Sequence, residues 1–228
     1  MTEKYSLHSP VTAETASNDT VIVPMTTEMV RKAARVHLDA LAGSRTACMG
    51  PAYVRALIDW FRRAEYGGIA LIAIDRPNDV VGYVIGAPLG YPGVLSRDLV
   101  WIAAGAVILR PWLFFKPQFR NGLVGRLRLL LGRPRLPGAG PELPAPTMSL
   151  VAIGVSPAAR GKKIGLRLVQ AFERRSREMQ MRSLRLSTSF DNTVARRLYE
   201  RCGWRPFSAS DGMLYYFRIL EGHSQAEK

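Results

Sequence analysis

The residues from Val155 to Gly165, with the sequence VSPAARGKKIG, are of types that could bind an anion. A β-type run precedes them, and a strongly patterned apolar run typical of a helix follows. At such a junction the unpaired amides of the helix's first turn and the helix dipole favour negative charge. Three cations and two glycines lie there: Arg160, Lys162, Lys163, Gly161 and Gly165. The spacing is neither that of a Walker loop nor that of a dinucleotide fingerprint, so we predict a phosphate-binding loop of another kind.

A second run, Asn192–Trp204, is predicted to form a short helix with a phenol on one face. Asn192, Ala195 and Tyr199 recur at three- and four-residue spacing, which places them on the same side of a helix. Gly203 can supply the left-handed turn that ends it. We therefore expect Tyr199 to face a bound ligand, with Asn192 behind it.

Together, these two runs resemble the GNAT (GCN5-related N-acetyltransferase) superfamily. Its pyrophosphate loop carries Arg/Gln-x-x-Gly-x-Gly/Ala, and Arg160 and Gly165 occupy the first and last positions, after the lead-in Val155-Ser156-Pro157. The second run is similar to the family's Asn-x-x-Ala-x-x-Leu-Tyr-x-x-x-Gly-Phe/Trp helix. Lys163 stands where the family has its central glycine. If the backbone there needs a positive φ, that geometry is costly for a residue with a side chain.

The resemblance implies an acetyl-CoA-dependent enzyme with direct acyl transfer and no covalent enzyme intermediate. It implies two central strands, Ser149–Val155 and Ser183–Thr188, that splay apart around the pantetheine arm. The cofactor would then be held by Ile153, Val155, Arg160, Gly161, Lys162, Lys163, Ile164, Gly165 and Asn192. Tyr199 is the expected catalytic residue, because a phenol can protonate a departing thiolate when it lies close to it. The general base stays open among Asp191, Glu142, His37 and water.

The remaining runs predict the other elements of one domain. A β run at Val21–Pro24 precedes helices at Met29–Ala42 and from Pro51 to about Ala64. Ile69–Ile74 and Val80–Ala87 predict a hairpin. The later predicted elements are a helix at Leu166–Met181 and strands at Trp204–Ser208 and Met213–Ile219. With the resemblance, this order implies an α+β fold in α/β/α layers, in which helices flank a mixed, mostly antiparallel sheet.

The expected organisation is a flexible tail at 1–20, a single acyltransferase domain at 21–220 and a tail at 221–228. A helical and aromatic insertion at about 95–146 interrupts the domain. Its apolar run Leu99–Leu109 is too short and too soon broken for a transmembrane helix. We interpret the insertion as a lid or packing element, with a dimer contact and an interfacial membrane anchor as alternatives.

The charge of the chain indicates an anionic partner. Lys and Arg number 32 against 18 Asp and Glu, which gives a formal net charge of +14. Every charge between Leu99 and Pro141 is positive, which suits an anionic membrane surface contacted through 99–135 or a phosphorylated acceptor. No helix-turn-helix, zinc-finger or RNA-binding motif is visible, and this disfavours nucleic acid. A homodimer is compatible with this composition.

Several other residues are expected to be structural. His37 is predicted to be a hydrogen-bonded core histidine, and Cys48 and Cys202 passive apolar residues. Glu173 and Glu178 are predicted to be solvated and paired with neighbouring arginines. The two distant cysteines support neither a zinc site nor a disulfide framework, so we expect no metal. They favour a cytoplasmic protein, which would be peripheral to the membrane's inner face if the insertion is an anchor.

The resulting functional hypothesis is an N-acetyltransferase that moves an acetyl group from acetyl-CoA to a primary amine of a small molecule or amino sugar. Two alternatives stay open. One is acetylation of a protein N-terminus or lysine, and the other is a non-catalytic acyl-CoA-binding module.

Overall fold

The described part of the chain forms a seven-stranded sheet with the strand order β1-β2-β3-β4-β5-β7-β6. The computed structural model describes residues 20–75, 79–110, 142–210 and 212–220. The strands are β1 (Val21–Pro24), β2 (Ile69–Asp75), β3 (Asp79–Pro88), β4 (Thr147–Val155), β5 (Ser183–Ser189), β6 (Arg205–Ser210) and β7 (Met213–Ile219). Neighbouring described strands are all antiparallel except β4 and β5, which are parallel. The predicted mixed, mostly antiparallel sheet is confirmed.

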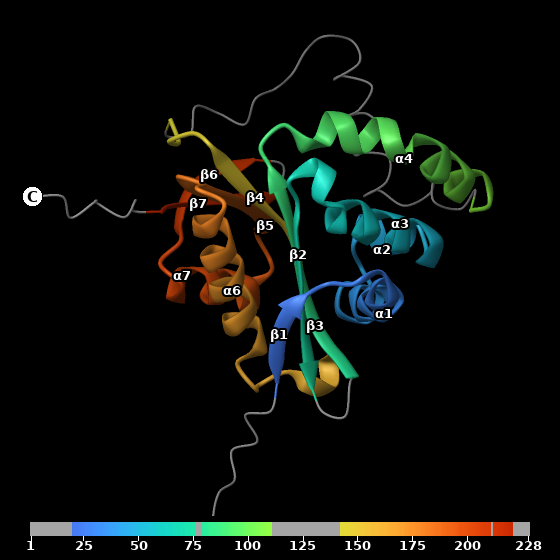
Figure 1. The fold of residues 1–228 in the computed structure, drawn as a ribbon, viewed down its shortest axis with the longest axis horizontal. Helices are drawn as coiled ribbons and strands as arrows, with labels where there is room; N and C mark the ends of the chain where they lie inside the picture. Colours follow the sequence, from blue (N-terminus) through green and yellow to red (C-terminus); the bar gives the residue numbers. More distant parts are fainter. Residues whose placement is uncertain (1–19, 76–78, 111–141, 211, 221–228) are drawn as a thin grey trace, which may run out of the picture.

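Helices cover both faces of this sheet (Figure 1). The α-helices are α1 (Val30–Ala40), α2 (Arg45–Cys48), α3 (Pro51–Arg62), α4 (Tyr91–Ile108), α6 (Ile164–Glu178) and α7 (Thr193–Arg201). On one face lie α1, α3 and α4, and on the other lie α6 and α7. The predicted α/β/α layering is therefore confirmed, with the sheet as the middle layer.

Each face of the sheet has its own apolar core. Phe61 of α3 and Tyr83 of β3 are fully buried in the core beneath α1, α3 and α4. Phe172 of α6 and Trp204 are buried in the core beneath α6 and α7. Burying each large side chain of this kind contributes about 1.5–3 kcal/mol, so the apolar stripes of the helices hold them against the sheet.

Local sequence determines where several helices begin. Pro51 occupies the first turn of α3, where its missing N–H costs nothing, after Gly50 with φ 91°. The expected helix Met29–Ala42 is shorter than predicted, because its start is the 3-10 turn Thr27–Met29 and α1 ends at Ala40.

The predicted hairpin is confirmed, since β2 and β3 pair antiparallel from Ile69↔Gly86 to Asp75↔Asp79.

The two central strands separate halfway along their length. β4 and β5 pair from Thr147↔Ser183 to Leu150↔Leu186, and their pairing stops there. Against β3, Ile85 pairs with Ala152 and Gly86 with Leu150, so Val151 is an extra, bulged residue in β4. Because a bulge bends its strand, it turns β4 away from β5 at this point. The predicted splay is therefore present in the fold.

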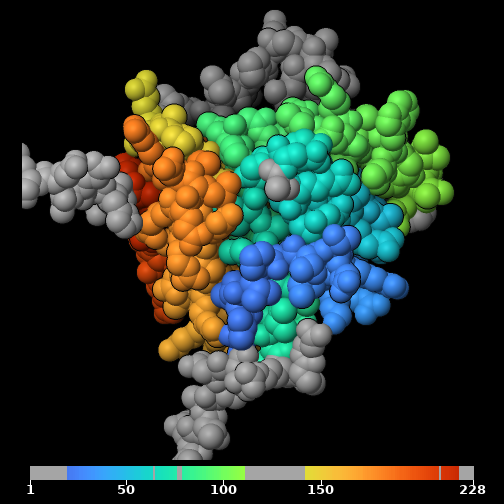
Figure 2. Space-filling model, viewed as in Figure 1, coloured from blue at the N-terminus to red at the C-terminus, as the bar shows by residue number. Residues whose placement is uncertain are grey.

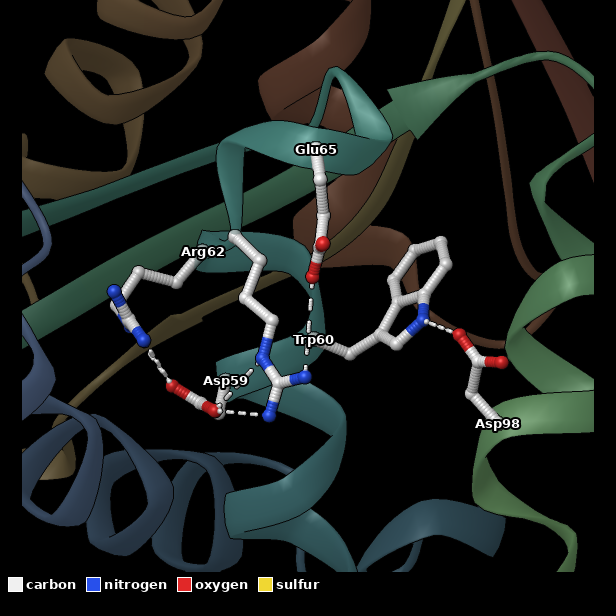
Figure 3. Close-up of polar contacts among 6 residues, drawn as sticks. Asp59, Trp60, Arg62, Glu65 and Asp98 are labelled. Carbon is white, nitrogen blue, oxygen red and sulfur yellow. Dashed lines mark hydrogen bonds and ion pairs between the residues drawn. The ribbon is translucent and has the colours of Figure 1, made fainter.

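Helix α4 packs along α3 on the side of the sheet away from α6 (Figures 1 and 2). It begins at Tyr91, directly after β3, rather than near residue 95 where the insertion was expected to start. The Trp60 indole donates to Asp98 Oδ2 at 2.8 Å (Figure 3). Arg110 donates to the Met49 carbonyl at 2.8 Å. Leu99 and Ala106 are buried, whereas Trp101 is 82% exposed. This part of the insertion is thus a packed element.

The rest of the predicted insertion lies mainly at 111–141, outside the described residues, and so do the tails at 1–19 and 221–228. The predicted lid, membrane and dimer roles of 99–135 remain predictions. Within the described ranges, no helix combines the length and the apolar character needed to cross a bilayer.

Candidate active site

The loop between β4 and α6 leaves the N-terminus of α6 free to bind an anion. No side chain caps this helix, and its first intrahelical bond joins the Arg167 amide to the Lys163 carbonyl at 3.1 Å. The amides of Ile164, Gly165 and Leu166 therefore point out of the first turn. Together with the helix dipole, these donors form an environment suited to phosphate oxygens.

Lys163 adopts the left-handed conformation, with φ 57° and ψ 15°. This is the position at which the sequence departs from the family's glycine, and the chain keeps a positive φ there with a lysine. Gly161 also has a positive φ, 84°, and its Cα faces open space. The loop thus turns twice through left-handed backbone before α6 begins.

The three cations of the loop lie at its surface. Arg160, Lys162 and Lys163 are all exposed. The Lys162 ammonium lies 3.4 Å from Asp75 Oδ2 at the end of β2, so part of its charge is balanced within the protein. Since this pair is exposed, it holds Lys162 only weakly.

Gly165 brings α6, α7 and β4 close together. A Cβ at this position would lie 3.3 Å from Leu198 Cδ2 and 3.8 Å from Val155 Cγ2. Leu198 belongs to α7 and directly precedes Tyr199. Because Gly165 has no side chain, α7, which carries Tyr199, can lie against the first turn of α6. The structure thus brings the two predicted motifs together.

Tyr199 is almost fully buried on the inner side of α7, with 4% of its surface exposed. Its ring packs against Trp204 and Tyr216, each with a centroid separation of 6.0 Å. No described residue forms a hydrogen bond with its hydroxyl. Burial raises its pKa above the ordinary value of a phenol, so the hydroxyl keeps its proton at neutral pH.

Asn192 lies at the start of α7. Its side-chain oxygen accepts a hydrogen bond from the Ala195 amide at 3.2 Å, which makes it the helix N-cap. This capping explains the residue type without a ligand. A contact between Asn192 and the cofactor stays a prediction.

Ile153 and Val155 lie in the part of β4 that has a neighbour on one side only. They pair with Val84 and Gly82 of β3, and beyond Leu150 no described strand pairs with the other edge of β4. Their side chains pack with the α6 core. Backbone groups on the open edge can therefore pair with an extended ligand, as strand addition does elsewhere.

A cavity of about 340 Å³ opens where β4 and β5 separate. Its walls are Ser149–Val151 of β4, Arg185–Ser187 of β5 and Leu89–Pro92 after β3. Leu150 and Leu186 point into the α6 core, so by strand alternation Ser149, Arg185 and Ser187 point to the opposite face. The cavity therefore reaches the splay from the face opposite the phosphate-binding loop.

The sequence pattern around β5 does not reveal this cavity. Arg185 and Ser187 interrupt an apolar alternation in β5, a pattern that marks the outward face of a strand but does not show what lies opposite. Tyr91 was missed because the helix α4 begins before the apolar run that predicted it.

His37 is held from both sides of its ring. Nδ1 lies 2.6 Å from the Tyr83 hydroxyl and Nε2 lies 2.8 Å from Thr46 Oγ1. Burial lowers the pKa of His37 to about 4. The predicted structural role is confirmed, and a histidine of that pKa is a weak base at neutral pH. The other candidate bases, Glu142 and Asp191, are exposed.

One structural expectation is wrong. Glu173 is not solvated but 4% exposed, and it accepts hydrogen bonds from Trp204 Nε1 at 2.8 Å and Arg218 at 2.9 Å. Glu173 lies on the buried face of α6, so its carboxylate takes its hydrogen bonds from residues that are distant in the sequence. Glu178 behaves as predicted, since it is exposed and pairs with Arg175 at 2.9 Å.

Cys202 is buried in the core beneath α6 and α7, as expected of a passive apolar residue. Neither Cys48 nor Cys202 forms a disulfide, and burial raises the pKa of the Cys202 thiol to about 11. No group of three or more metal-ligating side chains occurs among the residues that the structure describes.

A mixed sheet whose parallel central strands separate, beside a helix N-terminus open to phosphate, is the arrangement that the resemblance to the GNAT superfamily implied. The chain belongs to the acetyltransferase (GNAT) family, whose sequence model matches residues 38–204. It is accordingly an acetyltransferase, and acetyl-CoA is its cofactor. No curated protein matches the chain significantly in sequence.

Solved structures share the fold at low sequence identity. Ribosomal-protein-alanine N-acetyltransferase from Brucella melitensis matches with a TM-score of 0.54 at 16% identity, covering 88% of this chain and 99% of its own. The yncA protein from Salmonella typhimurium, solved with its cofactor acetyl-CoA, matches at 0.56 and 12%, covering 92% and 99%. The polyamine N-acetyltransferase of Drosophila melanogaster matches at 0.56 and 13%, covering 89% and 100%. At these identities the likeness establishes the fold.

Proposed function

We propose that the chain transfers an acetyl group from acetyl-CoA to the primary amine of a small molecule. The observation that carries this proposal is the interrupted pairing of β4 and β5 at Leu150↔Leu186, with an anion-binding helix start on one face and a cavity on the other. A donor and an acceptor that enter from opposite faces meet in the gap between the strands.

The residues present suit acetyl-CoA. The free amides at Ile164–Leu166 and the cations Arg160 and Lys163 hold the pyrophosphate, and the open edge of β4 at Ile153 and Val155 pairs with the pantetheine amides. The bound cofactor supplies an activated thioester, whose C–S bond breaks as the amine nitrogen forms the new C–N bond. Tyr199 keeps its proton at neutral pH and donates it to the departing sulfur.

The walls of the cavity indicate how the amine loses its proton. They contain no carboxylate and no histidine among the described residues, and the only phenol is that of Tyr91. Burial raises the pKa of Tyr91, so it holds its own proton. The ammonium form of the acceptor therefore loses one proton before it enters the gap between β4 and β5. After the neutral amine has attacked, it gives up a second proton to water. The volume of about 340 Å³ suits a small acceptor.

A binding and turnover experiment tests this proposal. Thiol release from acetyl-CoA is measured across a library of primary amines, and calorimetry measures CoA binding. Arg160→Glu should weaken CoA binding about tenfold or more, because a carboxylate then faces the phosphates. Arg177→Glu is the matched control, since Arg177 is exposed in the last turn of the same helix and should leave binding unchanged.

Two results would contradict parts of the proposal. CoA binding without turnover on any amine would point to the non-catalytic binding module. Equal loss of CoA affinity in Arg160→Glu and Arg177→Glu would show that only the net charge matters, and the cradle would then lie elsewhere.

A further inference from the structure

Among the described residues that line the cavity at the strand separation, Arg185 is the one cation. The residue lies on β5 at the last paired positions, next to Leu186, and it points away from the α6 core. It is half-buried, and no described residue forms a hydrogen bond or ion pair with its guanidinium. A partly desolvated guanidinium without an anionic partner is costly, and elsewhere in this chain Arg62, Arg63, Arg175 and Arg218 each pair with a carboxylate.

The surroundings of Arg185 suit an anion. Ser149 and Ser187 contribute hydroxyls to the same walls, and Tyr91 lies near enough for Arg185 to oppose the rise of its pKa. No carboxylate lines the cavity among the described residues, so nothing in the walls competes for the guanidinium. A planar fork of N–H donors binds a carboxylate or phosphate in two parallel hydrogen bonds.

We infer that the acceptor is a primary amine that also carries an anionic group, a carboxylate or a phosphate, and that Arg185 binds that group in the cavity between β4, β5 and the start of α4. This inference rests on the proposed function and names the acceptor class of the same site. Arg185 then attracts the anionic end of the acceptor, which lies apart from the reacting amine.

The same charge excludes a second class of acceptor. A polyamine enters with several positive charges, and like charges in a confined, partly desolvated space repel strongly. The similarity of this fold to that of the Drosophila polyamine N-acetyltransferase therefore does not imply a polyamine acceptor for this chain. Specificity here comes from repulsion of cations as well as from attraction of anions.

Matched amine pairs test the inference with the full chain. β-Alanine is compared with its amide, and O-phosphoethanolamine with ethanolamine, so that each pair differs in the anionic group while keeping the same type of amine. Spermidine is the polycationic probe. Wild type should prefer the anionic member of at least one pair by about tenfold or more in kcat/KM, and the pair that responds distinguishes carboxylate from phosphate.

Variants then assign the preference to Arg185. Arg185→Gln should lower kcat/KM for the preferred anionic amine about tenfold or more and leave its neutral partner within about twofold, mainly through KM. Arg185→Lys keeps the charge but loses the planar fork of donors, so it should retain part of the preference. If Arg185→Gln does not fold, the partial loss in Arg185→Lys tests the same role. Arg182→Gln removes an exposed charge just before the same strand and should leave both amines unchanged.

The outcomes separate this inference from the proposed function. Transfer to neutral amines or spermidine without preference for an anionic partner would overturn the inference and leave the acetyltransferase proposal standing. Equal losses on both members of a pair in Arg185→Gln would also overturn it. Absence of transfer to every amine, with intact CoA binding, would overturn both.

Discussion

Tyr199 shows how burial keeps a phenol protonated. Its ring packs against Trp204 and Tyr216, and burial raises the pKa of its hydroxyl, so in the proposed mechanism the proton passes to the departing thiolate only at short range. Acting as a general acid therefore requires proximity more than acidity.

Tyr199→Phe removes the hydroxyl and keeps the ring's packing, so the fold and CoA affinity should change little. The single-turnover rate of acetyl transfer should fall about a hundredfold to ten-thousandfold, because a positioned proton donor is lost. Rapid-quench measurement under single-turnover conditions excludes a masking effect of product release. A wild-type rate in this variant would make Tyr199 a purely structural tyrosine.

His37 gives the molecule a dependence of stability on acid. Burial lowers its pKa from 6.5 to about 4, so between these values the unfolded chain binds the proton more readily than the folded chain. The stability contributed by neutral His37 is therefore complete above pH 6.5 and is lost as the pH falls toward 4.

His37→Gln keeps an uncharged donor and acceptor but cannot titrate. The unfolding free energy of wild type should fall by about 2 kcal/mol more than that of His37→Gln between pH 7 and pH 5. Urea unfolding of both proteins at the two pH values measures this difference, and the carboxylates shared by both proteins cancel. Parallel losses in the two proteins would show that folding does not lower the pKa of His37.

At the scale of elements, the first turn of α6 depends on a strained residue. A side chain in the left-handed region costs about 1–2 kcal/mol, and Lys163 bears this cost directly before the free amides of the helix. Strain of this kind persists where the surrounding structure holds it, here between the end of β4 and the packing of Gly165 against Leu198.

Two substitutions separate the backbone of Lys163 from its charge. Lys163→Gly and Lys163→Ala both remove the ammonium, but only glycine relieves the strain. The glycine variant should be about 1 kcal/mol more stable than the alanine variant, while their CoA affinities should be equal. Denaturant unfolding and calorimetry measure the two quantities. Equal stabilities would contradict the left-handed conformation of this residue.

At the scale of the whole molecule, Glu173 links the elements that follow α6. Its carboxylate receives the Trp204 indole and the Arg218 guanidinium of β7, and Arg218 also donates to the Cys202 carbonyl at the end of α7. One buried charge thus connects α6 with α7 and β7, the elements that position Tyr199.

Glu173→Ala leaves Arg218 and the Trp204 N–H without their acceptor, so it should lower the unfolding free energy by about 3 kcal/mol. Glu178→Ala, on the same helix, removes an exposed pair with Arg175 and should change it by less than about 0.5 kcal/mol. Urea unfolding at neutral pH compares them. Similar effects of the two substitutions would mean that Glu173 is solvated after all.

By itself, the sequence determined the parts of this protein whose cause is local. The small-residue loop before α6, the short helix α7 and the apolar spacing of α1, α3 and α6 depend on residues a few positions apart, and the sequence pattern indicates them directly. Two such motifs were enough to indicate the family, the sheet and the phosphate-binding loop.

Only the tertiary structure decided which distant residues share a space. Arg185 and Tyr91 line one cavity because β4 bends at Val151 and leaves β5, and Glu173 is buried because Trp204 and Arg218 close over it. Burial and charge pairing depend on neighbours across the fold rather than along the chain. The proposed acceptor side of the site therefore follows from the packing of β4, β5 and α4, whereas the proposed cofactor side was already indicated by the motifs.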